Sequence, residues 1–238
     1  EQNLIPNNPA AEVDPPKFDG APMKVLTGAQ LDAFMKVIEK DAFWHDFFYT
    51  AVTTGLRRGE ILALQWDDLD LCTGVLRIER QVQRVRRELV ISAPKTKSSC
   101  RSIILPAPIL GVLRDYRQSI RSRWMFPSPK KEDSPLDPAA VRKKLAKVLN
   151  RADCKHIRFH DLRHTFATHA LASGVDAKTL SGILGHTKAS FTLDTYTHVT
   201  GDMQRTAAEI VGDFMTEILG EEMKPWQNAE NEGTGASI

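Results

Sequence analysis

Five side chains suited to handling a phosphodiester lie within a short stretch of otherwise apolar helical pattern: His160, Arg163, His186, Tyr196 and His198. Arginine and histidine side chains can bind the negative charge that develops on a phosphate under attack, and a tyrosine hydroxyl can act as the attacking oxygen. Together these residues indicate covalent phosphoryl transfer.

Each of these residues also has an ordinary structural role. His160 and Arg163 share one face of a helix, where they can simply pair with a neighbouring aspartate. His186 follows Gly185 and can bond to the backbone there, and a lone tyrosine such as Tyr196 is more often a packed aromatic side chain. The functional interpretation therefore depends on the joint occurrence of these residues.

The histidines between residues 160 and 169 raise the question of a metal site. His160 and His164 are four positions apart on a helix, and His169 follows them. However, no glutamate accompanies them in an HExxH arrangement and no cysteine is close in sequence. We therefore expect neither a metal ion nor an organic cofactor.

Three basic residues far upstream extend the candidate set. Arg57 and Arg58 follow Gly55, where a helix over residues 44–54 should end because glycine readily adopts the left-handed cap conformation. A side chain beside such a junction can be held rigidly while it faces a cleft. Lys95 lies in a polar turn between two expected strands.

Helical periodicity surrounds these positions. Thr27 and Gln30 form a capping box at the start of the first helix. Further helices are expected near residues 110–120, 137–150, 161–174 and 176–184. Between residues 75 and 106 the apolar period changes to two, which predicts a small antiparallel sheet. The expected fold is therefore mainly α with a small antiparallel β-sheet, an α+β domain.

The two ends of the chain differ from its middle. Residues 1–24 lack apolar periodicity and are typical of an extended linker. Because the first residue is Glu1 rather than methionine and a linker follows it, we expect a fragment from which a preceding domain is absent. Residues 25–200 form the expected catalytic domain, and residues 201–238 contain an amphipathic helix followed by an acidic tail.

Composition favours a globular body with a polyanionic partner. Of the 238 residues 42% are apolar, which is enough for a core. The net charge of +2 hides an uneven distribution, because residues 25–200 carry 28 basic against 18 acidic side chains. The candidate DNA-binding residues are Arg84, Arg86, Arg87, Lys97, Arg101, Arg142, Lys143, Lys147 and Arg158.

The three cysteines are scattered and show no CxxC spacing, so they indicate neither a disulfide framework nor a zinc knuckle. No apolar run approaches the roughly 18 residues that cross a bilayer. We expect a cytoplasmic protein that associates with the nucleoid when it binds DNA and that has no membrane partner.

Four motifs, in this order, resemble one known family. They are TGLRRGEILALQW at 54–66, PKTKSSCR at 94–101, HDLRHT at 160–165 and LGH at 184–186, with a tyrosine ten residues after the last histidine. This pattern is similar to the catalytic domain of the tyrosine recombinases, also called the phage integrase family. The resemblance spans about residues 25–200 and implies the tyrosine recombinase catalytic-domain fold. It also implies that an N-terminal DNA-binding domain is absent from this fragment.

The residues of this chain match the family motifs position by position. The six positions that match catalytic residues are Arg57, Lys95, His160, Arg163, His186 and Tyr196. Arg58 then falls at a variable position, and Lys97 is the alternative to Lys95. Glu60 and His198 match accessory positions that orient Arg57 and brace the tyrosine segment.

The resemblance implies a site-specific recombinase that cuts and rejoins DNA through a 3'-phosphotyrosine intermediate without metal or ATP. The long basic strand before PKTKSSCRSIILP is more like integrases of prophages and conjugative transposons than chromosome-dimer resolvases. We therefore expect a mobile-element integrase that supports integration and excision. Its expected partners are double-stranded DNA at recombination sites, further copies of the chain as a dimer to tetramer on DNA, and an accessory directionality protein.

Several alternatives remain open at this point. A type IB topoisomerase would share the chemistry but relax DNA instead of exchanging strands. A catalytically silent DNA-binding regulator would keep the basic fold alone, and a metal hydrolase would use the histidines of residues 160–169. The apolar face of the C-terminal helix can pack on its own domain or dock on a neighbouring protomer.

Overall fold

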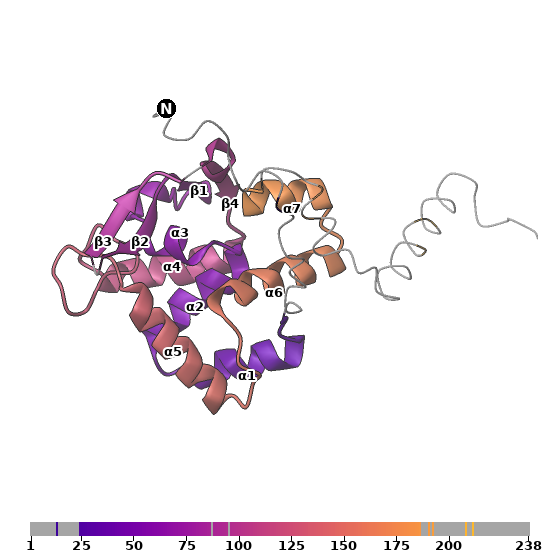
Figure 1. Cartoon of the computed structure of the whole chain (residues 1–238), viewed down its shortest axis with the longest axis horizontal. Helices are drawn as coiled ribbons and strands as arrows, with labels where there is room; N and C mark the ends of the chain where they lie inside the picture. The colour runs from indigo at the N-terminus through magenta and orange to yellow at the C-terminus, as the bar shows by residue number, and fades with distance from the viewer. Residues whose placement is uncertain are drawn as a thin grey trace, which may run out of the picture.

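The computed structural model describes residues 24–86, 88–94 and 96–186, together with the single positions Val13, Ser190, Thr192, Ala208 and Val211. The main helices in this part of the chain are α1 (Gly28–Ile38), α2 (Ala42–Thr54), α3 (Arg58–Leu62), α4 (Ala107–Ser119), α5 (Pro138–Arg151), α6 (Phe159–Ala172) and α7 (Ala177–Leu184). The strands and the two short 3-10 helices are β1 (Val75–Ile78), β2 (Gln81–Val85), β3 (Glu88–Ser92), β4 (Arg101–Ile104), η1 (Trp66–Asp68) and η2 (Lys97–Ser99). The expected mainly α, α+β fold is confirmed (Figure 1).

Helix α2 lies at the centre of the helical body, where it packs against α1, α4 and α6. Its Phe47 and Phe48 are fully buried. The Phe47 ring meets Phe126 edge to face at 5.1 Å, and Phe48 meets Phe34 in the same way at 5.2 Å. Burial of such a side chain stabilises the fold by roughly 1.5–3 kcal/mol. The core therefore holds α2, and with it the Gly55 junction, in one place.

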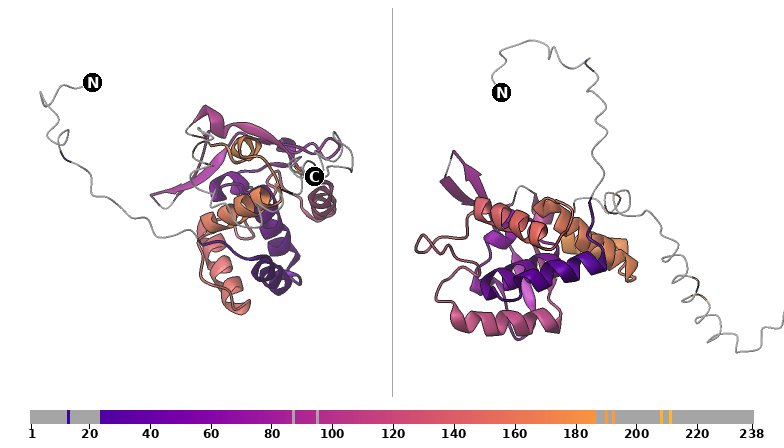
Figure 2. Two further views of the ribbon diagram at one scale, coloured as in Figure 1. Left: turned by 90° about the vertical axis from the view of Figure 1, so that its right-hand side faces the viewer. Right: turned by 90° about the horizontal axis from the view of Figure 1, so that it is seen from below.

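The expected strands form, but they pair as two separate two-stranded sheets instead of one. Strand β1 pairs antiparallel with β4, and β2 pairs antiparallel with β3. The break between the two sheets falls at residues 79 and 80, where the Arg80 guanidinium forms an ion pair with the buried carboxylate of Asp68. Strand β2 packs against α3, and the far end of the β2–β3 hairpin projects beyond the helices, as Figure 2 shows.

The helices that carry the candidate residues begin and end close to the predicted positions. The Thr27–Gln30 capping box is present, and α2 ends at Gly55 with a left-handed φ of 61°. Helix α7 begins after Asp176, whose carboxylate accepts the Thr179 amide, and it ends at Gly185 with φ 68°. These caps place Arg57 and His186 directly after two rigid helix ends.

The predicted linker at residues 1–24 and the predicted C-terminal segment at 201–238 lie almost entirely outside the described residues. The domain boundaries therefore stay predictions. Across the part of the chain that the structure describes, every helix is too short or too polar to cross a membrane.

Candidate active site

The C-terminal end of α7 is the meeting point of three arginines from distant parts of the chain. Arg101 Nε donates to the carbonyl of Ile183 at 2.6 Å, Arg163 Nη2 to that of Leu184 at 2.7 Å, and Arg57 Nη2 to that of Gly185 at 3.1 Å. The last carbonyls of a helix lack partners within the helix and carry its negative dipole end, so they attract cations. The three arginines therefore fix the helix end that precedes His186.

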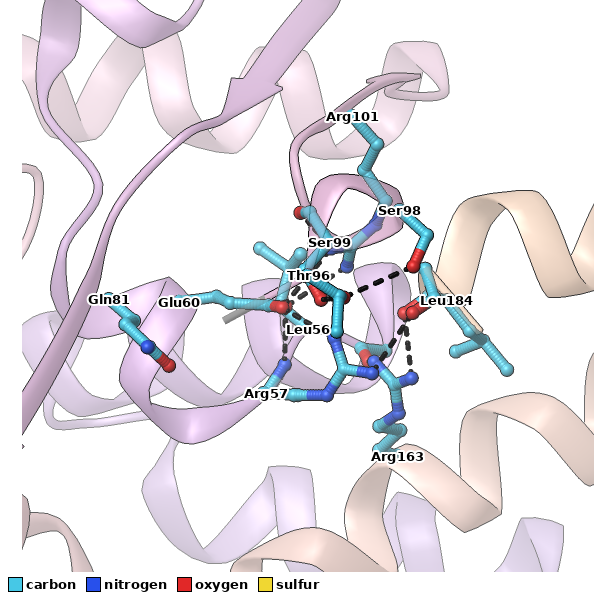
Figure 3. Close-up of polar contacts among 12 residues, drawn as sticks. Leu56, Arg57, Glu60, Gln81, Thr96, Ser98, Ser99, Arg101, Arg163 and Leu184 are labelled. Atoms are coloured by element: carbon cyan, nitrogen blue, oxygen red, sulfur yellow. Dashed lines mark hydrogen bonds and ion pairs between the residues drawn. The ribbon is translucent and has the colours of Figure 1, made fainter. Parts of the chain in front are cut away.

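Arg163 is the most deeply buried of these arginines, with 1% of its surface exposed. Its Nη1 group donates to the carbonyl of Gly55 at 3.0 Å, while Nη2 bonds to Leu184. One guanidinium thus joins the cap of α2 to the cap of α7. Figure 3 shows Arg57 and Arg163 approaching Leu184 from different elements.

Glu60 holds two of the arginines at once. Its Oε1 accepts a 2.7 Å bond from Arg57, and its two carboxylate oxygens accept from Arg101 at 3.1 and 3.0 Å. The predicted orienting contact between Glu60 and Arg57 is present in the structure. Burial would raise the pKa of Glu60, but the hydrogen bonds and charges of Arg101 and Arg57 outweigh it and hold that pKa below its usual value. Glu60 is therefore ionised at neutral pH.

His160 lies one turn before His164 on α6, and the two rings meet edge to face at 4.6 Å. Desolvation, with the charges of His164 and Arg163 adding to it, lowers the pKa of His160 to about 4. One edge of the residue stays exposed, beside a hollow of about 400 Å³ whose rim includes Arg58, Arg142 and Arg158. At neutral pH His160 is thus an uncharged ring that can accept a proton.

His186 directly follows the capped end of α7. Its Nδ1 lies 2.8 Å from the Thr192 hydroxyl, and its amide donates to the carbonyl of Ser181. Desolvation, followed by the charges of Arg163 and Arg57, lowers the pKa of His186 to about 4. His160 and His186 are both influenced by the charges of Arg57 and Arg163, so these four side chains share one electrostatic environment.

The remaining predicted catalytic and accessory residues, Lys95, Tyr196 and His198, lie outside the described residues. The same is true of Arg87 and of the side chain of Lys97. Their roles stay predictions. In the described part of the chain, no group of three His, Cys, Asp or Glu side chains is arranged to hold a metal ion.

The predicted DNA-binding residues divide into two groups. Exposed positions on the hairpin, on α5 and before α6 are Arg84, Arg86, Arg142, Lys143, Lys147 and Arg158. Arg101 is different, because its side chain is only 7% exposed and is bound to Glu60. The prediction of a direct DNA contact does not fit this burial, because the guanidinium is turned to the buried carboxylate of Glu60.

The structural roles of two residues of the site were not predicted from the sequence. Arg101 is a structural contact of Glu60, 41 positions away, which no local pattern could indicate. Asp161, 1% exposed, accepts the Arg158 amide at 2.7 Å and caps the start of α6. The spacing of Arg158 and Asp161 matches a capping box and could have indicated this second role.

Known proteins that resemble this chain identify its family. The family model described as "Phage integrase family" matches residues 24–203. A tyrosine recombinase XerC-like protein of Caldanaerobacter subterraneus subsp. tengcongensis is 31% identical over 189 residues, which are 70% of this chain and 48% of that protein. The ICEBs1 integrase of Bacillus subtilis is 26% identical over 224 residues, 90% of this chain and 61% of its own length. The chain thus spans about half of the curated relatives it matches.

A solved structure shares the fold. The Tn1549 transposon integrase in complex with a circular intermediate DNA superposes with a TM-score of 0.70 at 24% sequence identity, over 82% of this chain and 68% of that one. At this level of identity the likeness concerns the fold. It confirms the α+β architecture expected from the motifs.

Proposed function

The chain belongs to the phage integrase family, and from that premise we propose that it is the catalytic part of a site-specific DNA recombinase of a mobile element. It cuts and rejoins DNA through a 3'-phosphotyrosine intermediate. The observation that carries this proposal is the meeting of Arg57, Arg163 and the His186 segment at one helix end, next to an uncharged His160. A regulator that only binds DNA has no need of this preorganised set.

The proposed nucleophile is the hydroxyl of Tyr196. A tyrosine has a pKa of about 10, so roughly one hydroxyl in a thousand is ionised at neutral pH without help. The positive charges of Arg57 and Arg163 favour the phenolate, and His160, which is uncharged at neutral pH, is the proposed proton acceptor. The phenolate attacks the phosphorus, the bond to the 5' oxygen breaks, and the 3' phosphate becomes attached to the tyrosine.

The departing 5' oxygen needs a proton, and Lys95 is the proposed donor. The arginines stabilise the charge on the non-bridging oxygens of the transition state, because guanidinium groups donate planar pairs of hydrogen bonds, and His186 adds a donor. The phosphotyrosine keeps the energy of the broken bond, so a 5' hydroxyl of another strand can reverse the reaction. Neither a metal ion nor ATP is required in this scheme.

Affinity for DNA comes from the exposed basic side chains of α5 and of the β2–β3 hairpin in this proposal. Contacts of this kind neutralise phosphates and release counterions, so binding weakens steeply as salt rises. They carry no base information by themselves. The Tn1549 integrase, whose fold is similar, was solved in complex with a circular intermediate DNA, which supports DNA as the partner.

The decisive experiment is incubation with nicked DNA that carries a candidate attachment site. The expected product is a denaturant-resistant adduct whose tethered peptide, identified by mass spectrometry, contains Tyr196. Tyr196→Phe should bind the same DNA with nearly unchanged affinity and form no adduct. An adduct in the Phe variant would show that another residue is the nucleophile.

Recombination and DNA relaxation are separated by a second assay. Supercoiled DNA with two paired sites should give exchanged products, whereas relaxation that is independent of such sites would favour a topoisomerase. We further propose that the active form is a dimer to tetramer on DNA in the cytoplasm, with the C-terminal helix docking on a neighbouring protomer and a directionality protein as an accessory. Light scattering with and without site DNA tests the assembly.

A further inference from the structure

We propose that Arg101 is a positioning residue that places the loop carrying Lys95 against the rest of the active site. This inference rests on the proposed function, because it concerns the residue that protonates the leaving oxygen. It assigns to Arg101 neither a DNA contact nor a contact with the reacting atoms. Arg101 instead connects three parts of the site: the Lys95 loop, Glu60 with its bound Arg57, and the helix end before His186.

The contacts of Arg101 are numerous and shielded from water. Its guanidinium binds both oxygens of Glu60 and the carbonyls of Ile183 and Ser99, at distances from 2.6 to 3.1 Å. The side chains of Arg101 and Glu60 are 7% and 3% exposed. A paired, charge-assisted contact of this kind has a fixed direction as well as strength. Arg101 therefore determines where strand β4 begins.

The loop before β4 is a compact unit that Arg101 anchors. The Thr96 hydroxyl lies 2.8 Å from that of Ser99, and the Ser99 amide donates to the Thr96 carbonyl at 3.0 Å. The Ser99 carbonyl in turn accepts from Arg101. Because Thr96 directly follows Lys95 in the sequence, the position of this unit sets the point from which the lysine reaches.

Gly185 allows the loop and the helix end to come together. A Cβ atom at this position would lie 2.9 Å from Arg101 Nη1 and 3.0 Å from the carbonyl oxygen of Ser98. Its φ of 68° also disfavours any other residue. The contact between loop and helix thus depends on the absence of a side chain, as expected for a close fit that positions one element on the other.

The placement of the loop that carries Lys95 matters for the proposed proton transfer. A general acid must lie within hydrogen-bond reach of the atom that it protonates, and a displacement of about 1 Å can cost on the order of a hundred-fold in rate. Lysine at position 101 would keep the charge but lose the fork that grips both oxygens of Glu60 and the Ile183 carbonyl. Arg101→Lys is therefore the informative substitution.

The test compares two DNA substrates, one ordinary and one with sulfur in place of the bridging 5' oxygen. A thiolate leaves without a proton, so the sulfur substrate does not need the acid. For Arg101→Lys we expect adduct formation to fall about ten-fold to a hundred-fold on ordinary DNA. On sulfur DNA the loss should be at least about three-fold smaller, because only the effect through Glu60 and the helix end of α7 remains there. Lys95→Ala is the reference, with a larger loss and the same rescue.

The matched control is Arg123→Lys, the same change in an exposed ion pair with Asp133. This control should leave the rate of adduct formation unchanged on both ordinary and sulfur DNA. Equal losses on both substrates in Arg101→Lys would overturn the proposal, because Arg101 would then act only through Arg57 and His186 or through general stability. An unchanged rate on ordinary DNA would overturn it as well.

A second measurement needs no DNA and separates this proposal from the proposed function. Hydrogen exchange of residues 96–100 in the free protein should be about ten-fold faster in Arg101→Lys, because the loop loses its anchor, and unchanged in Arg123→Lys. Unchanged exchange in Arg101→Lys would overturn the positioning role. If the wild-type chain forms no adduct with any site DNA, the proposed function fails, while the exchange result still decides whether Arg101 holds the loop.

Discussion

The end of α7 and the outer face of α5 both gather positive charge, but the protein holds the two groups very differently. Arg101 and Arg163 are buried and bonded to backbone carbonyls or to Glu60. On α5, by contrast, Arg142, Lys143 and Lys147 are exposed. Charges with fixed directions can act on a transition state without reorganising, whereas exposed ones contribute mainly affinity. In the proposed function the same formal charge thus serves two purposes, which the net charge of the chain does not distinguish.

Removal of Arg163 should have the largest effect. Arg163→Ala leaves the carbonyls of Gly55 and Leu184 without their donor, at a cost of about 1–3 kcal/mol of unfolding free energy for each buried acceptor. Loss of its charge from the site should slow adduct formation by about a thousand-fold. Chemical denaturation and adduct kinetics measure the two effects. Arg142→Ala is the control, with stability within about 0.5 kcal/mol of wild type; similar stability losses in both variants would contradict the distinction.

A change at the Gly55 junction should have the next largest effect. Gly55→Ala places a Cβ 2.3 Å from the Phe166 ring at a left-handed φ of 61°, and it displaces the carbonyl that binds Arg163. We expect a loss of about 1–3 kcal/mol and slower cleavage. Gly111→Ala, in α4 with open space around the new atom, should instead stabilise by about 0.4–1 kcal/mol. A Gly55→Ala variant with unchanged stability and cleavage rate would mean that the junction tolerates movement.

Acidification should act on the two histidines near the end of α7 and spare the cations of α5. Burial lowers the pKa of His160 and His186 to about 4, from a usual 6.5. The unfolded chain therefore binds more protons between these values, so this contribution to stability is present above pH 6.5 and is lost as the pH falls towards 4. Melting temperatures across this range should fall less steeply for His186→Gln than for wild type. An equal slope in the variant would exclude His186 as a cause.

The exposed cations should give the smallest effect per residue. Lys143→Ala and Lys147→Ala should each reduce the slope of log binding constant against log salt by about 0.9 if the residue contacts one phosphate. The rate of adduct formation by bound protein should stay within about two-fold, since neither side chain reaches the helix end of α7 in this proposal. A large change in that rate would mean that α5 takes part in chemistry.

The sequence predicted best what local physics determines. The caps at Thr27 and Gly55 and the helix that carries His160 and Arg163 were found where glycine conformation, capping and apolar period place them. The contact between Glu60 and Arg57 spans only three positions, which is within reach of such patterns. The family resemblance then connected these segments into one site.

Long-range pairing was harder to predict. Strand β1 pairs with β4, more than twenty positions further along, although β2 follows it directly. Alternation of apolar residues predicts that a strand forms, but it does not identify the strand with which it pairs. For the same reason Arg101 was grouped with the DNA-binding cations, because composition reports a charge and not the buried carboxylate that meets it.

The three arginines at the end of α7 come from segments that lie far apart along the chain. A folding intermediate in which any one of these segments is still detached has an incomplete reaction centre, since the donors converge only in the native state. Under the proposed function, competence for cleavage would therefore appear only when all three segments have docked. A partly folded or proteolytically nicked molecule that bound DNA through its basic surface would then be unable to cut it.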